Sequence, residues 1–244
     1  MKHRIYVVGM GPGNENMMTP QAIEALEESE TIAGYQVYLN LLGERFKEKQ
    51  FLSTPMRQEV ERCKMCFEEA KKGKTVSMVC SGDAGVYGMA SLMYEIGQDY
   101  PDMELIVIPG ITAANSGAAA LGAPLNHDFC VISLSDLLTP WEQIEKRLTA
   151  AAMGDFAIAI YNPSSHKRAD YLKRACDILI ANGVEEKRAC GYVENIGREG
   201  TTTKTCTIAE LRECQVNMFT TVFIGNSKSQ ILDDKLITKR GYQV

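Results

Sequence analysis

No stretch of the sequence reaches the roughly 18 consecutive apolar residues that a membrane-spanning helix requires, so we expect no membrane span. The first residues run directly into an apolar, strand-like segment, without the pattern of a signal peptide. Low-complexity segments and obvious internal repeats are also missing. The formal net charge of -5 argues against a broad nucleic-acid-binding surface. These absences predict a globular protein without nucleic-acid or membrane partners.

Eight cysteines are scattered along the chain, and we expect them to be free thiols in a reducing compartment, the cytoplasm. Cys63 and Cys66 form one C-x-x-C pair, a spacing that zinc sites, iron–sulfur sites and redox pairs share. No second pair follows at metal-ligand spacing, and the pair falls in a helix-like segment, where positions i and i+3 share a face. We therefore predict buried packing thiols and no metal site.

Short apolar runs alternate with amphipathic segments along the chain, which predicts an α/β fold. The apolar runs are nearly continuous, as is typical of parallel-sheet strands that flanking helices bury on both faces. The predicted strands cover residues 4–9, 75–80, 105–109, 130–134, 156–161, 189–194 and 220–225. The predicted helices cover residues 20–28, 57–72, 86–100, 140–153, 166–182 and 207–214.

Residues 110–124, GITAANSGAAALGAP, are dense in small residues, which permit close backbone approach. A crossing between two domains or a wall that lines a ligand would both use such a segment. We place the domain boundary there. The sequence therefore predicts two α/β domains, residues 1–115 and 116–244, each of ordinary domain size.

The first predicted strand runs into three glycines, Gly9, Gly11 and Gly13, in the sequence GMGPG. A dinucleotide-binding loop needs G-x-G-x-x-G opening directly into a helix, but here the third glycine comes one residue early and the next helix begins several residues later. A P-loop needs Gly-Lys-Ser/Thr, and this loop has no lysine. Two interpretations stay open: a tight turn, or a loop whose bare backbone faces a ligand without phosphate.

Four further glycine-rich or polar segments each follow a predicted strand. They are SGDAGVYG from Ser81, PGITA from Pro109, LSDLLTPW from Leu134 and YNP from Tyr161. Open α/β sheets bind ligands at the carboxyl ends of their parallel strands, so this recurrence predicts a ligand site. Asp83 could accept hydrogen bonds from a ligand or act on a proton, or it could cap the following helix.

Together these five segments resemble the tetrapyrrole methylases, which use S-adenosylmethionine in cobalamin and sirohaem synthesis. The family pattern of a GxGPG loop, a G-D loop, a P-G-[IMV]-[ST] element and a tyrosine turn occurs here in order, and the resemblance covers essentially the whole chain. The segments GYQVYLNLL, SGDAGVYGMA, LGAPLNHDFCVISLSDLLTPW and IYNPSSHKR look most like the C17-methyltransferase branch, whose members contract the corrin ring.

The resemblance implies that S-adenosylmethionine lies in a cleft between the two α/β domains. It also implies a tetrapyrrole (precorrin) substrate and a homodimer. The cofactor-binding positions that it implies, the last two from less clear surroundings, are Gly11, Pro12, Gly82, Asp83, Val86, Thr112, Ala113, Asn162, Ile196 and Thr220.

Methyl transfer from a sulfonium needs little acid–base help, but ring contraction breaks and makes carbon–carbon bonds and therefore suits a proton donor or acceptor. His127 and Asp136 flank one predicted strand and are our catalytic candidates, with Tyr35 and Tyr87 as further candidates. Alternatively, His127 orders a loop and Asp136 caps the next helix. The candidates for binding substrate carboxylates, each of which could instead be an ordinary surface charge, are Lys167, Arg168, Arg198 and Lys204.

The implied reaction is methylation of C17 of metal-free precorrin-3B or its cobalt-bearing counterpart, with ring contraction. The free cysteines and the lack of an added oxygenase domain favour the cobalt form. The alternatives are a methylase acting at another corrin carbon, a NAD-binding oxidoreductase and a non-catalytic tetrapyrrole carrier. Product mass and the position of a labelled methyl group separate the methylases, and affinity for S-adenosylmethionine separates them from a carrier.

Overall fold

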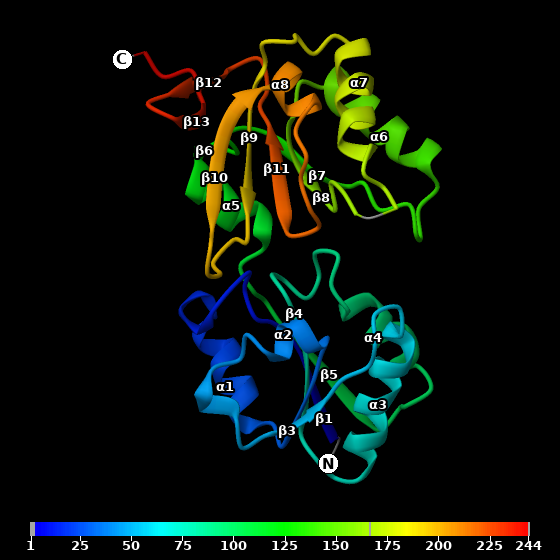
Figure 1. Cartoon of the computed structure of the whole chain (residues 1–244). Helices are drawn as coiled ribbons and strands as arrows, with labels where there is room; N and C mark the ends of the chain where they lie inside the picture. The colour runs from blue at the N-terminus through cyan, green and yellow to red at the C-terminus, as the bar shows by residue number, and fades with distance from the viewer. Residues whose placement is uncertain (1–2, 166, 244) are drawn as a thin grey trace. The chain divides into compact units, whose positions relative to one another are not determined.

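The computed structural model describes residues 3–165 and 167–243, and it divides the chain into two compact units, Met1–Thr112 and Ala113–Val244. Each unit has its own sheet with helices on both faces (Figure 1), which confirms the α/β prediction. Helix α5 (Ala113–Leu121) opens the second unit, within the small-residue segment where we placed the domain boundary without predicting a helix. No helix in the described ranges is long and apolar enough to cross a membrane.

The first unit contains a parallel sheet in the order β3-β2-β4-β1-β5. Its strands are β1 (His3–Gly9), β2 (Thr31–Ala33), β3 (Gln50–Leu52), β4 (Val76–Cys80) and β5 (Met103–Ile108). Helices α3 (Glu59–Lys71) and α4 (Ala90–Gly97) cover one face, and α1 (Pro20–Glu28) and α2 (Gln36–Leu39) cover the other (Figure 1). Short 3-10 helices span Glu15–Met17 and Glu44–Phe46. Because helices cover both faces, the central strand β4 is wholly buried.

Local sequence explains the start of α1 and the packing of α3. The Thr19 hydroxyl accepts a hydrogen bond from Ala22 N at 3.1 Å, and Pro20 takes the first helical position, as predicted. Cys63 and Cys66 are free and buried against the sheet, which confirms the packing prediction. Burial raises the pKa of Cys63 to about 12 and raises the pKa of Cys66 as well, so both thiols stay protonated near neutral pH.

The second unit contains a mixed sheet in the order β10-β9-β11-β8-β7. Its strands are β7 (Phe129–Ser133), β8 (Ala157–Tyr161), β9 (Ala189–Glu194), β10 (Thr202–Thr207) and β11 (Thr220–Ile224). Strands β7 and β8 pair in parallel, but the other three ladders are antiparallel. The prediction of parallel strands was therefore wrong for most of this sheet. A continuous apolar run reports burial on two faces, which helices also impose here, and it carries no information about strand direction.

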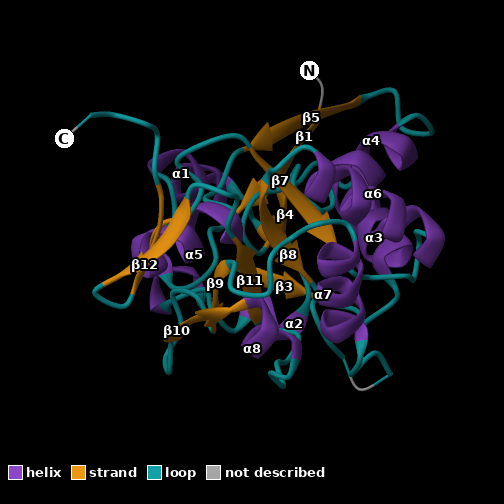
Figure 2. Ribbon diagram, turned by 90° about the horizontal axis from the view of Figure 1, so that it is seen from above, coloured by secondary structure: helices purple, strands orange, loops and turns teal. Residues whose placement is uncertain are grey.

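Helices α6 (Trp141–Met153), α7 (Tyr171–Ala181) and α8 (Ile208–Arg212) cover one face of the second sheet, and α5 covers the other. Helices α6 and α7 lie side by side (Figures 1 and 2). The predicted helix 166–182 includes His166, which lies outside the described residues, and the observed helix begins five residues later. A hairpin of β12 (Ser229–Leu232) and β13 (Lys235–Thr238) joins the short β6 (Gly122–Ala123) in a small third sheet.

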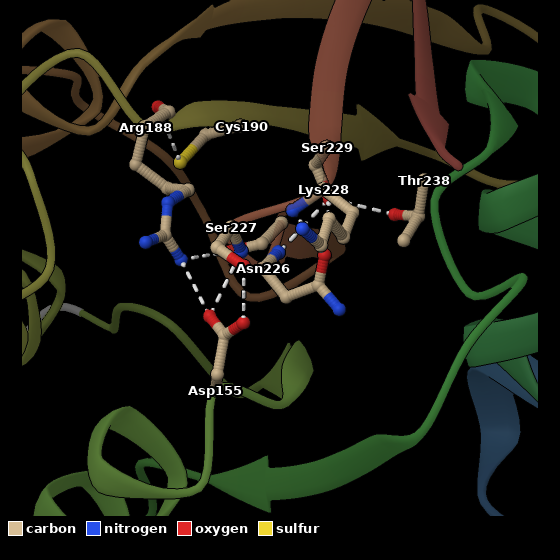
Figure 3. A network of polar contacts seen from close by, with 9 residues as sticks. Asp155, Arg188, Cys190, Asn226, Ser227, Lys228, Ser229 and Thr238 are labelled. Atoms are coloured by element: carbon tan, nitrogen blue, oxygen red, sulfur yellow. Dashed lines mark hydrogen bonds and ion pairs between the residues drawn. The ribbon is translucent and has the colours of Figure 1, made fainter. Parts of the chain in front are cut away.

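A network of hydrogen bonds and an ion pair connects strand ends at one edge of the second sheet (Figure 3). The Asp155 carboxylate pairs with Arg188 at 3.3 Å and accepts a hydrogen bond from Ser227 N at 2.8 Å. Arg188 also donates to Gly225 O at 3.1 Å, and the network continues through neighbouring side chains to Thr238 on β13. These contacts join the starts of β8 and β9 to the end of β11 and to the hairpin. Each polar group named here is used in holding the fold at this end of the sheet.

Candidate functional site

Loops after β1 and β4 are bridged at the carboxyl edge of the first sheet. Gly11 N donates to Gly82 O at 3.0 Å, and Gly82 N donates to Gly11 O at 2.8 Å. The φ angles of Gly11 and Gly82 are 74° and 72°, a conformation that favours glycine. The chain leaves β1 toward β2 and leaves β4 toward β5, in opposite directions along the sheet. The bridge therefore lies at the topological switch point, where open parallel sheets bind ligands.

The loop after β5 joins these two through direct backbone contact. A Cβ atom built on Gly110 would lie 2.2 Å from Gly82 O and 2.4 Å from Gly9 O. A Cβ atom on Gly9 would lie 2.6 Å from Gly110 N. All three spacings are far below van der Waals contact, so the three loops meet only because Gly9 and Gly110 carry no side chain.

Asp83 holds two of these loops with its carboxylate. Oδ1 accepts from Gly85 N at 2.8 Å and from Val86 N at 3.1 Å, while Oδ2 accepts from Gly110 N at 2.9 Å. Helix α4 begins only at Ala90, so the alternative that Asp83 caps the following helix is wrong. The carboxylate orders the backbone around it through three hydrogen bonds.

The remaining predicted positions of the first unit belong to the same loops. Pro12 follows Gly11, and Thr112 closes the loop after β5, where the Thr19 hydroxyl donates to Pro109 O at 3.3 Å. None of the loop segments 9–13, 81–88 and 109–112 contains lysine or arginine. These three segments therefore contain backbone groups, the hydroxyls of Ser81, Tyr87 and Thr112, and one carboxylate, but no cationic side chain.

In the second unit, β7, β8 and β9 run in one direction, so the loops that follow them share an edge of the sheet. Helix α5 begins at this edge, because Ala114 N donates to the Tyr161 hydroxyl, at the end of β8, at 2.7 Å. Strand β11 begins there too, since it is antiparallel to β9. The structure thus brings five predicted residues to one edge: Ala113, Asp136, Asn162, Ile196 and Thr220.

Asn162 connects the ends of two strands. Its side-chain amide donates to Ser133 Oγ, at the end of β7, at 2.9 Å. Its φ angle of 53° lies in the left-handed region that non-glycine residues seldom adopt. Asn195, directly after β9, has a φ angle of 52°. Asparagine is among the non-glycine residues that adopt this conformation most readily, so both residues turn the chain at this edge without exceptional strain.

Asp136 belongs to a cluster that the sequence did not reveal in full. Its carboxylate accepts from the Tyr171 hydroxyl at 2.6 Å and pairs with Arg168 at 3.4 Å, and Arg168 also donates to Ser135 Oγ at 2.9 Å. The hydrogen bond to Asp136 raises the pKa of Tyr171. Helix α6 begins at Trp141 without a side-chain cap, so the capping alternative for Asp136 is wrong. Arg168, a candidate for substrate binding, is engaged within the chain.

His127 lies at the opposite end of β7 from Asp136, and the strand between them spans about 16 Å. The two catalytic candidates therefore do not lie together in one site. The His127 side chain is 43% exposed, and its Nδ1 accepts a hydrogen bond from Asp128 N at 2.9 Å. Together with Leu125 and Arg240 it lines a cavity of about 370 Å³. This geometry matches the interpretation of His127 as a loop-ordering residue.

Sequence reasoning missed Arg62, Ser133, Ser135 and Tyr171. Ser133 ends β7 and Ser135 lies in the loop segment that the sequence did identify, on either side of Leu134, so polar residues in and beside that motif were a usable signal. Arg62 and Tyr171 lie in predicted helices, where charged and polar residues are expected, and nothing local distinguishes them. Of the other proposed substrate cations, Arg198 lies over the Phe219 ring with its guanidinium carbon 5.5 Å from the ring centre, and Lys204 lies exposed on β10.

Comparisons with known proteins agree over nearly the whole chain. Residues 4–212 match the family described as Tetrapyrrole (Corrin/Porphyrin) Methylases. A "Probable cobalt-factor III C(17)-methyltransferase" from Salmonella typhimurium is 44% identical over 97% of this chain and 98% of its own length. A "Precorrin-3B C(17)-methyltransferase" from Sinorhizobium sp is 35% identical over 99% and 98%. The crystal structure of the methyltransferase CobJ superposes with a TM-score of 0.88 at 36% identity, covering 96% of this chain and 99% of that one. From its loops, its fold and these matches, the chain belongs to the tetrapyrrole (corrin/porphyrin) methylase family.

Proposed function

We propose that this protein is an S-adenosylmethionine-dependent C-methyltransferase of cobalamin biosynthesis that methylates C17 of a precorrin-3 type macrocycle and contracts the ring. The observation that carries the proposal is the 44% identity, over nearly full lengths, to a probable cobalt-factor III C(17)-methyltransferase. Identity to the precorrin-3B enzyme is 35%, which favours the cobalt-bearing substrate over the metal-free one.

The loops at the edge of the first sheet fit the proposed cofactor. S-adenosylmethionine supplies a methyl group that its sulfonium already activates, and it carries no phosphate. Loops that hold a phosphate usually add a lysine or arginine to their backbone donors, and segments 9–13, 81–88 and 109–112 have neither. The cofactor-binding positions that we propose are Gly11, Pro12, Gly82, Asp83, Val86 and Thr112 in the first unit and Ala113, Asn162, Ile196 and Thr220 in the second.

The main contribution of the protein's residues to methyl transfer is to position the reacting groups. Asp83 and the glycines hold their loops in a fixed shape, which would orient a ligand for in-line transfer and exclude water. Asp136 is our candidate for moving a proton during ring contraction, because it lies at the same edge as Asn162 and Thr220 and has a phenol as a hydrogen-bond partner. Replacing Asp136 with Asn should lower turnover more than replacing His127 with Gln.

Calorimetric titration of the reduced protein with S-adenosylhomocysteine, with NAD as the control, tests the cofactor assignment. We expect micromolar binding of the first and none of the second. If the folded protein bound NAD, or neither compound, the methylase proposal would fail, and binding of a tetrapyrrole alone would indicate a carrier.

The reaction itself is tested with S-adenosylmethionine carrying a 13C-methyl group and either cobalt-factor III or precorrin-3B. We expect a product that gains one methyl group, with the label at C17 of a contracted ring, and faster turnover of the cobalt form. Label at another carbon without ring contraction would instead show a different corrin methylase. Efficient turnover of precorrin-3B alone would overturn the cobalt preference.

We also propose that the protein is a homodimer in the cytoplasm, as the family resemblance and the free thiols imply. Sedimentation equilibrium of the purified protein tests the first statement, and fractionation of the producing cells tests the second. A monomer across the micromolar range would refute the dimer.

A further inference from the structure

Arg62 is a largely buried charge whose partners among the described residues are few and distant. It lies in the first turn of α3 and is 4% exposed. Its guanidinium donates to Thr54 O at 3.4 Å and lies 3.8 Å from Glu59 Oε1. The Tyr35 ring centre is 6.0 Å away. One long hydrogen bond and one long ion pair engage only part of the five N–H donors, and because no fully buried side-chain nitrogen among the described residues lacks a partner, the remaining donors reach solvent.

Glu69, on the same helix, shows how this chain normally buries a charge. Its carboxylate accepts from Lys72 at 2.6 Å and from Lys74 at 2.7 Å. Arg62 has no comparable pair, and its position near the start of α3 is unfavourable because the N-terminal end of a helix carries positive partial charge. A cation buried with incomplete pairing lowers stability. Packing alone therefore does not explain an arginine at this position.

The position of Arg62 connects it to the candidate site. Helix α3 follows β3, so its first turn stands at the carboxyl edge of the parallel sheet, the edge that carries the Gly11–Gly82 bridge. Tyr35 and Thr54 belong to the loops after β2 and β3. Arg62 is also close enough to Cys80, the last residue of β4, for its charge to oppose the rise in that thiol's pKa that burial causes. Three strand ends therefore surround the guanidinium.

We propose that Arg62 is a specificity-determining residue that pairs with a peripheral carboxylate of the tetrapyrrole substrate. A carboxylate accepts two parallel N–H bonds from a guanidinium and would supply the close partner that Arg62 lacks. The half-buried Tyr35 ring lies beside Arg62, and the guanidinium donors without a partner in the described chain are the ones that would meet the carboxylate. The inference rests on the proposed function, because that function supplies a substrate with several carboxylates.

The test compares Arg62→Met and Arg62→Lys with Lys64→Met, which removes one exposed charge from the same helix. The probes are uroporphyrin III, a tetrapyrrole with eight carboxylates, its octamethyl ester and S-adenosylhomocysteine. We expect R62M to weaken uroporphyrin binding at least tenfold and R62K to weaken it less, because lysine loses the bidentate geometry. Binding of S-adenosylhomocysteine should change less than twofold in all variants, and K64M should bind all probes like the parent.

Stability separates a substrate role from a structural one. If Arg62 serves the substrate, R62M should melt at the same temperature as the parent or higher, because methionine keeps the apolar stem and removes a poorly paired charge. The inference is overturned if R62M binds uroporphyrin like the parent, if R62M melts several degrees lower, or if the ester binds the parent as tightly as the acid. It also fails if the parent binds S-adenosylhomocysteine but no uroporphyrin. A parent that binds neither probe contradicts the proposed function itself.

Discussion

In the first unit, Gly9, Gly82 and Gly110 bring three loops into direct backbone contact, whereas in the second unit side chains connect the corresponding loops. There, the Tyr161 hydroxyl accepts a hydrogen bond from Ala114 N, and the Asn162 side-chain amide donates one to the Ser133 hydroxyl. The ion pair of Asp136 and Arg168 adds a further connection. One sheet is parallel and the other is largely antiparallel, yet in each unit several loops gather at one edge of that unit's own sheet.

The difference predicts two kinds of tolerance. A backbone contact has no room for a Cβ atom, so any substitution must move a whole loop. A side-chain connection loses one hydrogen bond at a time, and its neighbours can adjust. Unlike the loop edges, the two cores are similar, since each packs apolar side chains and free thiols between its sheet and its helices.

The largest effect should come from Gly110→Ala, because its Cβ would meet backbone oxygens at 2.2 and 2.4 Å. We expect a loss of about 3 kcal/mol or more in the free energy of unfolding, and loss of S-adenosylhomocysteine binding. In Gly117→Ala on α5, the new Cβ meets side-chain atoms of Phe223 and Ile196 at 2.8 and 2.9 Å, which can shift. That variant should lose less, about 1–2 kcal/mol, because side-chain ends can shift further than backbone and alanine favours the helix. If urea denaturation showed equal losses of unfolding free energy for the two variants, the proposed difference between backbone and side-chain contacts would be wrong.

Alkaline pH tests whether the cores behave alike. Burial raises the pKa of Cys63 in the first unit, and of Cys176 and Cys206 in the second, to about 12. Because an unfolded thiol has a pKa of about 8.5, this stabilisation is complete below that pH and is lost as pH rises toward the folded values. We expect roughly 1–2 kcal/mol lost per thiol at pH 10 in reducing urea titrations.

Cys63→Ala and Cys176→Ala serve as matched controls, one in each unit. Each should flatten the alkaline loss by a similar share, after correction for its stability at pH 7.5. If only one of the two variants reduced the alkaline loss of stability, the two cores would differ in this respect.

Asp83→Ala tests how far the three loops of the first unit depend on the Asp83 carboxylate. The change leaves Gly85, Val86 and Gly110 without their acceptor, so the loops should spread. We expect S-adenosylhomocysteine to bind about tenfold more weakly, equivalent to ~1.4 kcal/mol. Asp83→Asn keeps one carbonyl oxygen and should lose less. If D83A bound the ligand like the parent, the carboxylate would have no role in ordering the site.

Tyr161→Phe should give the smallest effect, because it removes the hydroxyl that accepts a hydrogen bond from Ala114 N at 2.7 Å and leaves the ring in place. We expect about 1 kcal/mol, seen as a roughly fivefold higher KM for S-adenosylmethionine with kcat nearly unchanged. A loss as large as that of G110A would contradict the view that the second unit tolerates the loss of single connections.

Much of the local structure follows from the sequence because its causes are local. Apolar runs located seven strands, and helix caps such as Thr19-Pro20 located helix starts within a few residues. Strands β2 and β3 escaped because three residues show no periodicity. Strand β10, TTKTCT, escaped because a polar edge strand resembles a loop. The GxGPG, G-D and P-G-I-T segments by themselves indicate a ligand edge.

The sequence by itself determined which residues are apolar, which loops carry glycine and which family pattern they form. Only the tertiary structure decided that β11 runs against β8 and β9, that His127 and Asp136 stand at opposite ends of β7, and that Arg62 is buried at the edge of the first sheet. The physical reason is range. Caps, turns and periodicity act over a few residues, whereas strand direction and the pairing of a buried charge depend on contacts between segments far apart in the chain.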